Sequence, residues 1–309
     1  MAILVKSDFD NNWGDGLKSI LPDLDVRIWP DVGARDEIEY ALVWRPEHGF
    51  LASLPNLKVI YSVGAGIDHL AADPSLPRHI PVVRMVDPAL TQGMVSYVTW
   101  ACLHMFRKMF LAQQYQAENV WDSEPVIRLA SDRKTVGILG LGQLGQACSK
   151  QLQALDFDLV GWSATPKNVE GVTSYVGADG LDAMLRQTDY LVCLLPLTPD
   201  TQGILNKENM SKLKPEGGVV SAGRGGHLVE QDLADLLNAG HLSGAVVDVF
   251  STEPLPQDNP LWGQKNLIIT PHIASTTDPF SSGATVANSI KAFENGEALE
   301  NLVKWDVGY

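Results

Sequence analysis

Three ionisable residues follow consecutive apolar runs in the second half of the chain. Arg224 comes directly after Gly218–Ser221, Glu253 follows Gly244–Val249, and His272 follows Leu267–Thr270. A guanidinium binds a carboxylate through two parallel hydrogen bonds. An imidazole can donate a proton near neutral pH, and a carboxylate beside it favours its charged form. Each residue alone is common in a structural role, but the three together are suited to reducing the carbonyl of a 2-oxo acid.

A glycine-rich turn lies upstream of these residues, in the segment Thr135–Gly145. The apolar run Thr135–Leu139 leads into G-x-G-x-x-G, and a helical pattern follows, which is the context that a dinucleotide-binding loop requires. The first glycine allows the tight turn, the second admits a pyrophosphate, and the third lets the helix pack on the strand. The residues expected to contact the dinucleotide here are Gly140, Leu141, Gly142, Gln143, Leu144 and Gly145.

The end of the next apolar run indicates which dinucleotide binds. An enzyme that uses NAD usually carries Asp or Glu there, to hold the ribose 2′-hydroxyl. After Trp162 this chain has Ser-Ala-Thr-Pro-Lys and no carboxylate. Ser163, Thr165 and Lys167 are therefore candidates to bind a 2′-phosphate, and NADP is favoured over NAD.

Alternating strand and helix patterns predict the elements that position these groups. Continuous apolar runs suit parallel strands that are covered on both faces, and the repeated alternation indicates an α/β doubly wound fold. A long helical stretch, Thr91–Asn119, separates two series of strands and is read as one or two helices. The predicted strands are Ala2–Val5, Val26–Trp29, Ala41–Trp44, Val59–Ser62, Val82–Val86, Thr135–Leu139, Leu159–Trp162, Tyr190–Leu194, Gly218–Ser221, Gly244–Val249 and Leu267–Thr270.

Composition excludes several classes of protein. A length of 309 residues favours two domains. The net charge of −14 argues against nucleic-acid binding, and no apolar run is long enough to span a membrane. The three cysteines, Cys102, Cys148 and Cys193, match neither a disulfide framework nor a metal site, so no metal is expected. The first residues lack a signal-peptide pattern, and a cytoplasmic protein is expected.

The motifs resemble those of the D-isomer-specific 2-hydroxyacid dehydrogenases along essentially the whole chain. The resemblance is closest to the glyoxylate/hydroxypyruvate reductase A subfamily. It implies two parallel-sheet domains, a Rossmann-type cofactor domain at 90–275 and a flavodoxin-like substrate domain at 1–89 and 276–309, with substrate held in a cleft between them. The motifs are GLGQLG (140–145), LLPLTPDTQGILN (194–206), GRGGHLVEQDLADLL (223–237), GAVVDVFSTEPLP (244–256), TPHIA (270–274), SVGAGIDHL (62–70) and VGY (307–309).

The resemblance also implies a role for individual residues. Arg224 matches the arginine that binds substrate, and His272 with Glu253 matches the acid/base pair. Further expected substrate contacts are Ala65, Gly66, Trp44 and Arg45. Further expected cofactor contacts are Leu195, Pro196, Thr201, Ala222, Gly223 and Asp248. A homodimer is implied, with Trp121 as a residue that reaches the neighbouring subunit.

Departures from the family pattern leave alternatives open. The family usually has Asn where Ser221 stands, Ala where Gly223 stands and, in the reductase A subfamily, Arg where Ala164 stands. The function expected is reduction of a small 2-oxo acid of the glyoxylate or hydroxypyruvate type. One alternative is an NAD-dependent relative that acts on lactate-like, phosphoglycerate-like or bulkier acids. The other is a catalytically silent protein that binds the cofactor as a sensor.

Overall fold

The structure is a computed structural model that describes residues 1–8, 12–129 and 131–305. The chain divides into two compact units. Met1–Leu90 and Thr276–Tyr309 form the first, and Thr91–Ser275 form the second. The VGY sequence at 307–309 lies outside the described residues. Each unit is a parallel sheet covered by helices, so the expected α/β fold with two doubly wound domains is confirmed.

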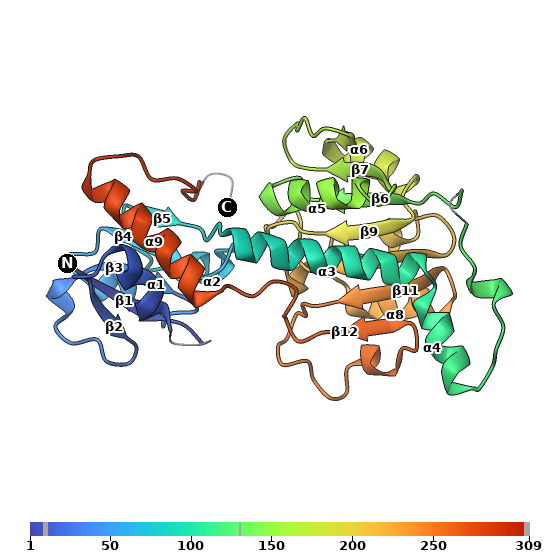
Figure 1. The fold of residues 1–309 in the computed structure, drawn as a ribbon, viewed down its shortest axis with the longest axis horizontal. Coiled ribbons are helices and arrows are strands. Elements are labelled where there is room, and N and C mark those ends of the chain that lie inside the picture. Colours follow the sequence, from blue (N-terminus) through green and yellow to red (C-terminus); the bar gives the residue numbers. More distant parts are fainter. Residues whose placement is uncertain (9–11, 130, 306–309) are drawn as a thin grey trace. The chain divides into compact units, whose positions relative to one another are not determined.

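The first unit is built on a five-stranded parallel sheet in the order β2-β1-β3-β4-β5 (Figure 1). This is the flavodoxin-like strand order, in which ligands bind beyond the carboxyl ends of the strands. Its strands are β1 (Ala2–Lys6), β2 (Asp25–Ile28), β3 (Ile38–Val43), β4 (Val59–Ser62) and β5 (Val82–Val83). Its helices are α1 (Trp13–Ile20), α2 (Asp68–Ala71), α9 (Pro279–Glu294) and the short 3₁₀ turns η1 (Arg35–Glu37) and η2 (Leu51–Ser53).

Close contact between α1 and α9 closes one face of the first sheet. A Cβ added to Gly16 would lie 2.3 Å from the carbonyl oxygen of Phe280, so only glycine allows the two helices to approach this closely. Both helices bury apolar side chains in one core, including Trp13 and Ile290. The C-terminal helix therefore belongs to the N-terminal sheet, as the discontinuous arrangement of the chain requires.

The second unit is built on a seven-stranded parallel sheet in the order β12-β11-β10-β9-β6-β7-β8 (Figure 1). Its strands are β6 (Thr135–Leu139), β7 (Asp158–Trp162), β8 (Val172–Tyr175), β9 (Tyr190–Cys193), β10 (Gly217–Ser221), β11 (Leu242–Val247) and β12 (Leu267–Ile269). Its helices are α4 (Met109–Ala117), α5 (Gln143–Gln153), α6 (Gly177–Leu185), α7 (Lys207–Met210), α8 (Glu230–Asn238) and η3 (Glu124–Val126), η4 (Gly225–His227) and η5 (Pro260–Gly263). Helix α3 (Pro88–Phe106) begins in the first unit and packs on this sheet.

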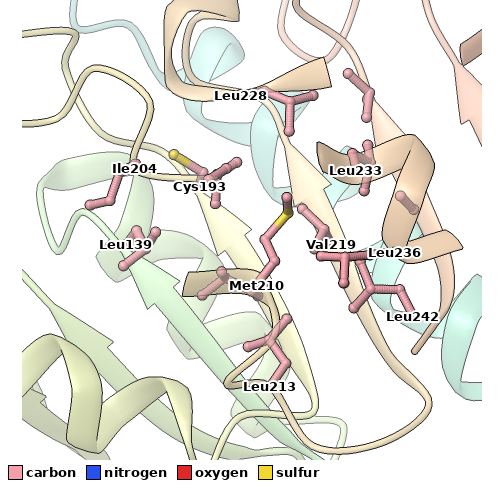
Figure 2. Close-up of a cluster of buried hydrophobic side chains, with 14 of the residues drawn as sticks. Leu139, Cys193, Ile204, Met210, Leu213, Val219, Leu228, Leu233, Leu236 and Leu242 are labelled. Carbon is pink, nitrogen blue, oxygen red and sulfur yellow. The ribbon is translucent and has the colours of Figure 1, made fainter. Parts of the chain in front are cut away.

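Two cores cover the faces of the second sheet. Helices α3 and α5 pack on one face through residues such as Cys102 and Cys148. Helices α6, α7 and α8 pack on the other face, and Figure 2 shows Met210, Leu233 and Leu236 in one cluster with Cys193 and Val219 of the sheet. The central strands β6 and β9 are apolar on both sides, which is why each appears in the sequence as a continuous apolar run.

Most predicted strands occur close to their expected ends, with two differences. Strand β8 was not predicted, because this edge strand is only half-buried and has no continuous apolar run. The predicted strand Val82–Val86 is reduced to β5. The long helical stretch, expected as one or two helices, is two helices, α3 and α4, because Lys108 adopts a left-handed conformation with φ 52° and ends the first of them.

The three cysteines are buried and free of disulfides. Burial raises the pKa of the Cys148 and Cys193 thiols to about 12, which leaves little thiolate at neutral pH. Across the part of the chain that the structure describes, no helix is long and apolar enough to cross a membrane. In that same part, no three His, Cys, Asp or Glu side chains are grouped to hold a metal ion.

Candidate active site

The three residues with acid, base and anion-binding chemistry follow three adjacent strands of the second sheet. Arg224 follows β10, Glu253 follows β11 and His272 follows β12. These strands are neighbours and run parallel. The loops after them therefore leave the sheet at the same edge, which is where open α/β sheets bind ligands.

Glu253 and His272 form an oriented pair. The Nδ1 atom of His272 lies 3.0 Å from Oε2 of Glu253. The other carboxylate oxygen of Glu253 accepts a hydrogen bond from the backbone N–H of Phe250, at 3.0 Å. Because both carboxylate oxygens are engaged, the imidazole is held with Nδ1 toward Glu253. The His272 side chain is 34% exposed, which allows its other nitrogen, Nε2, to meet a substrate.

Asp248 fixes the loop that carries His272. This buried carboxylate accepts hydrogen bonds from the backbone N–H groups of Ile273 and Ala274, at 2.8 and 2.9 Å. It also accepts one from the hydroxyl of Thr270, at 2.6 Å. The residue was predicted as a cofactor contact, and its hydrogen bonds show in addition that it shapes the loop. His272 itself has φ 56°, a conformation that such contacts must stabilise.

Tyr97 of α3 extends this network, and sequence reasoning did not find it. Its hydroxyl lies 2.6 Å from Oγ1 of Thr270. Since Thr270 donates its proton to Asp248, Tyr97 donates to Thr270. Burial raises the pKa of the Tyr97 hydroxyl, so the hydroxyl keeps its proton and remains the donor in this series of hydrogen bonds. Helix α3 is thereby connected to the His272 loop.

The Arg224 loop is packed directly against the Glu253 loop. A Cβ on Gly225 would lie 1.9 Å from the carbonyl carbon of Phe250, so the two backbones touch. Arg224 is half-buried, and its Nη1 donates to the carbonyl oxygen of Gly223 at 2.8 Å. The structure therefore brings the three loops together: the Arg224 loop touches the Glu253 loop through Gly225, and Glu253 contacts His272.

His227 is the second residue that sequence reasoning missed. Its side chain is fully buried below Arg224. Nδ1 lies 3.1 Å from the backbone nitrogen of Arg224, and Nε2 lies 3.2 Å from the carbonyl oxygen of Pro196. The only signal in the sequence was a histidine three positions after the arginine, within the glycine-rich stretch 223–227.

The glycine loop before α5 has the shape that a pyrophosphate needs. A Cβ at Gly145 would lie 1.9 Å from the carbonyl oxygen of Gly140, so glycine there allows the helix to pack on the turn. Gly140 has φ 102°, which favours glycine. A Cβ at Gly142, the residue before α5, would meet no atom within 4 Å. This open side, together with the free N–H groups of the first helical turn, fits a bound dinucleotide.

The loop that follows β7, the strand after the glycine loop and α5, carries no acidic side chain near its start. Ser163 directly follows β7, and its hydroxyl donates to the carbonyl oxygen of Thr165 at 2.7 Å. Thr165 and Lys167 are both exposed. No Asp or Glu occurs between Trp162 and Val169. The residues present fit a 2′-phosphate better than a 2′-hydroxyl that needs a carboxylate.

The remaining cofactor candidates lie in the loops after β9 and β10. Leu195 and Ala222 are buried, and Gly223 approaches the carbonyl oxygen of Leu195 so closely that a Cβ would lie 3.1 Å away. The hydroxyl of Thr201 donates to the carbonyl oxygen of Pro196 at 2.8 Å. The loop after β9 is thus fixed internally and also packs against the loop after β10.

The four candidates in the first unit follow β3 and β4. Among the described residues, the backbone N–H groups of Ala65 and Gly66 donate no hydrogen bond, so both can bind an anion. Trp44 packs its ring on His69, with 4.3 Å between centroids, and the Arg45 guanidinium lies 5.6 Å from the Trp44 ring. Gly64 makes room for this ring, since a Cβ there would lie 2.9 Å from Trp44.

Comparisons with known proteins agree with this geometry. Residues 99–274 match the family model described as D-isomer specific 2-hydroxyacid dehydrogenase, NAD binding domain. The chain is 38% identical over 302 residues to glyoxylate/hydroxypyruvate reductase A of Yersinia enterocolitica, covering 96% of each chain. It is 39% identical over 302 residues to the protein of the same name from an Enterobacter species, again covering 96% of each.

Solved structures extend the likeness to three dimensions. A D-isomer specific 2-hydroxyacid dehydrogenase from Xanthobacter autotrophicus Py2, in complex with NADPH and MES, has a TM-score of 0.94 at 38% identity. The NADPH-dependent glyoxylate/hydroxypyruvate reductase of Sinorhizobium meliloti, in complex with NADP and sulfate, has a TM-score of 0.91 at 37% identity. Both comparisons cover 100% of this chain and 99% of the other. The chain belongs to the D-isomer specific 2-hydroxyacid dehydrogenase family and, within it, to the glyoxylate/hydroxypyruvate reductase A subfamily.

Proposed function

We infer that this protein reduces a small 2-oxo acid of the glyoxylate or hydroxypyruvate type to the 2-hydroxy acid, with NADPH as the reductant. The observation that carries the inference is the His272–Glu253 pair, held beside the loop of Arg224 at one edge of the second sheet. A protein that only sensed the cofactor would need none of these three ionisable groups. The reductase A relatives, which match along almost the whole chain, support the choice of substrate class.

The chain's own residues bind the substrate and supply its proton. Arg224 binds the carboxylate and draws electron density from the adjacent carbonyl. His272, in its charged form, donates a proton from Nε2 to the oxygen on which negative charge develops. Glu253 keeps Nδ1 occupied and stabilises the charged imidazole. The reduced nicotinamide, when bound, supplies the hydride that reduces the carbonyl carbon.

The dinucleotide is held by the second unit. The glycine loop Gly140–Gly145, with Leu141, Gln143 and Leu144 between the glycines, takes the pyrophosphate at the N-terminus of α5. Ser163, Thr165 and Lys167 take the 2′-phosphate, and NADPH is preferred over NADH. Leu195, Pro196, Thr201, Ala222, Gly223 and Asp248 are proposed as the contacts of the nicotinamide half.

The first unit is proposed as the substrate domain, with bounds 1–89 and 276–309, and the cofactor domain as 90–275. The amides of Ala65 and Gly66 would bind the substrate carboxylate. Trp44 and Arg45 would limit the size of the substrate side chain. Their support is the pair of available amides and the packed aromatic residues described above.

A homodimer in the cytoplasm is the proposed state of the protein. Its support is a set of exposed large apolar side chains on and after α3, since such patches mark contact surfaces. Trp100 is 41% exposed and Trp121 fully exposed. A cavity of about 570 Å³ beside α3 is lined in part by Trp100, Leu103 and Met109. Analytical ultracentrifugation tests the dimer, and a monomer at micromolar concentration would contradict it.

An absorbance assay at the reduced-nicotinamide band tests the proposed function. Purified protein is mixed with NADPH or NADH and with glyoxylate, hydroxypyruvate, pyruvate or phenylpyruvate. The expected result is fastest oxidation of NADPH with glyoxylate or hydroxypyruvate. Absence of turnover with every 2-oxo acid would contradict the function, and faster turnover with NADH would contradict the cofactor preference.

A further inference from the structure

His227 connects two loops that the proposed function uses for different purposes. One ring nitrogen contacts the backbone N–H of Arg224, at 3.1 Å. The other contacts the carbonyl oxygen of Pro196, at 3.2 Å. Arg224 is proposed to bind substrate and Pro196 to border the cofactor. The ring is fully buried, so no water competes for either contact.

These two contacts require a single form of the ring. Nδ1 faces an N–H donor, so it accepts a hydrogen bond and carries no proton. Nε2 faces a carbonyl oxygen, so it carries a proton and donates it. The imidazole is therefore neutral, with its proton on Nε2. Each nitrogen contributes a different contact, and the two contacts can be removed one at a time.

The surrounding residues are shaped around this ring. A Cβ on Gly223 would lie 3.1 Å from Nδ1 and 3.2 Å from Cε1 of His227, so glycine gives the ring its space. Leu228, the next residue, is buried in the core that Figure 2 shows, beside Leu233 and Val219. His227 is therefore followed by a core residue, and its ring contacts the active-site loop through the backbone of Arg224.

We propose that His227 is a positioning residue, which fixes the backbone of Arg224 and links it to the cofactor loop at Pro196. Binding of the dinucleotide along that loop then sets the placement of the arginine before substrate arrives. The inference rests on the proposed function, because it takes Arg224 as the substrate-binding group. It goes further by assigning a role to a residue that contacts neither substrate nor cofactor.

Two substitutions separate the contacts. An Asn side chain places its amide oxygen near the position of Nδ1, so His227→Asn keeps the acceptor for Arg224 and loses the donor to Pro196. A Gln side chain reaches the position of Nε2, so His227→Gln keeps the donor to Pro196 and loses the acceptor. His241→Asn is the matched control, because His241 lies in the same unit before β11, at the opposite edge of the sheet.

The two variants have opposite expected signatures. His227→Gln should lower kcat/KM for the 2-oxo acid by roughly 10–100-fold at saturating NADPH, since a misplacement of about 1 Å has that effect, and should leave the Kd for NADPH unchanged. His227→Asn should lower kcat/KM much less than His227→Gln does, because it keeps the acceptor for Arg224, and should raise the Kd for NADPH up to about tenfold, as loss of one buried hydrogen bond would. Equal effects of both variants on both quantities, or no effect, would overturn the proposal.

A binding measurement on the unmodified protein covers the case in which both variants misfold. Hydrogen exchange followed by mass spectrometry reports the protection of the Arg224 amide, with and without NADPH and without substrate. Added protection is expected when NADPH binds, and unchanged protection would overturn the proposal. If the unmodified protein turns over no 2-oxo acid, the proposed function fails instead, and the two failures are thereby distinguished.

Discussion

Gly225 lies against Phe250 so closely that a single added carbon would fall 1.9 Å from the carbonyl carbon of Phe250. Gly225 follows Arg224, and the carboxylate of Glu253 accepts from the N–H of Phe250. The guanidinium and the carboxylate that supports His272 are therefore related through one backbone contact. Their relative placement depends on glycine at position 225, because a side chain there would push the two loops apart.

Gly225→Ala should separate these loops. The overlap requires a backbone shift of more than a few tenths of an ångström, and kcat/KM should fall by about 100-fold or more. Steady-state kinetics and thermal unfolding measure the two effects. Gly263→Ala is the control, because a Cβ there meets no atom within 4 Å. Wild-type kinetics in Gly225→Ala would show that the contact does not set the geometry.

Arg224→Ala should remove the group that binds the substrate carboxylate. The expected loss in kcat/KM is at least about 10²–10³-fold, since the charge that Arg224 stabilises develops in the transition state. The Kd for NADPH, measured by fluorescence titration, should not change. Arg186→Ala is the matched control, because Arg186 pairs with Asp182 on an exposed surface. Near-normal turnover without Arg224 would exclude the residue from the site.

Ser163→Asp should change the choice of cofactor. A carboxylate at the end of β7 would repel a 2′-phosphate and accept hydrogen bonds from a 2′-hydroxyl. The ratio of kcat/KM for NADPH to that for NADH should fall by roughly 100-fold or more, as expected for like charges in contact. The control is Ser163→Asn, whose side chain has nearly the same size as that of Asp but no charge. In this variant the ratio should fall far less. Equal ratios in the two variants would mean that charge at this position does not select the cofactor.

Asp189 should make part of the stability depend on pH. Burial alone would raise its pKa, but hydrogen bonds from Lys134, the N–H of Thr135 and Lys214 hold the pKa below its usual value. A depressed carboxyl pKa adds stability that is fully present above the unfolded-state pKa of about 4 and is lost as pH falls through the folded-state value.

Asp189→Asn should therefore lower the free energy of unfolding by about 1–3 kcal/mol at pH 7 and reduce its loss on acidification. Urea unfolding between pH 3 and pH 7 measures both. Asp158→Asn, which removes an exposed ion pair with Arg133, should have little effect. A variant with the same pH dependence as the wild type would exclude Asp189 as the source.

Much of the fold could be predicted because it depends on local pattern. Buried parallel strands have continuous apolar runs, so β6 and β9 were located almost to the residue. The glycine turn at Gly140 was recognised because its neighbours are a strand and a helix. The half-buried strand β8 has no continuous apolar run and could not be located in this way. The break between α3 and α4 depends on the left-handed conformation of Lys108, which no residue type there indicates.

The site was harder to predict, because its support comes from residues distant in sequence. Arg224, Glu253 and His272 could be proposed from their places after predicted strands. The contacts of His227 with Pro196 and of Tyr97 with Thr270 span 31 and 173 positions, and no spacing rule relates them. Asp248 was proposed for the cofactor, and its hydrogen bonds to the His272 loop became visible only in the folded chain.

A crystal structure of the protein with NADP and oxalate, an unreactive analogue of a 2-oxo acid, tests the central claim most directly. We expect a carboxylate of oxalate to pair with the Arg224 guanidinium and a second oxygen to lie within hydrogen-bond distance of His272 Nε2. Oxalate bound away from Arg224, or His272 turned so that Nε2 faces Glu253, would contradict it.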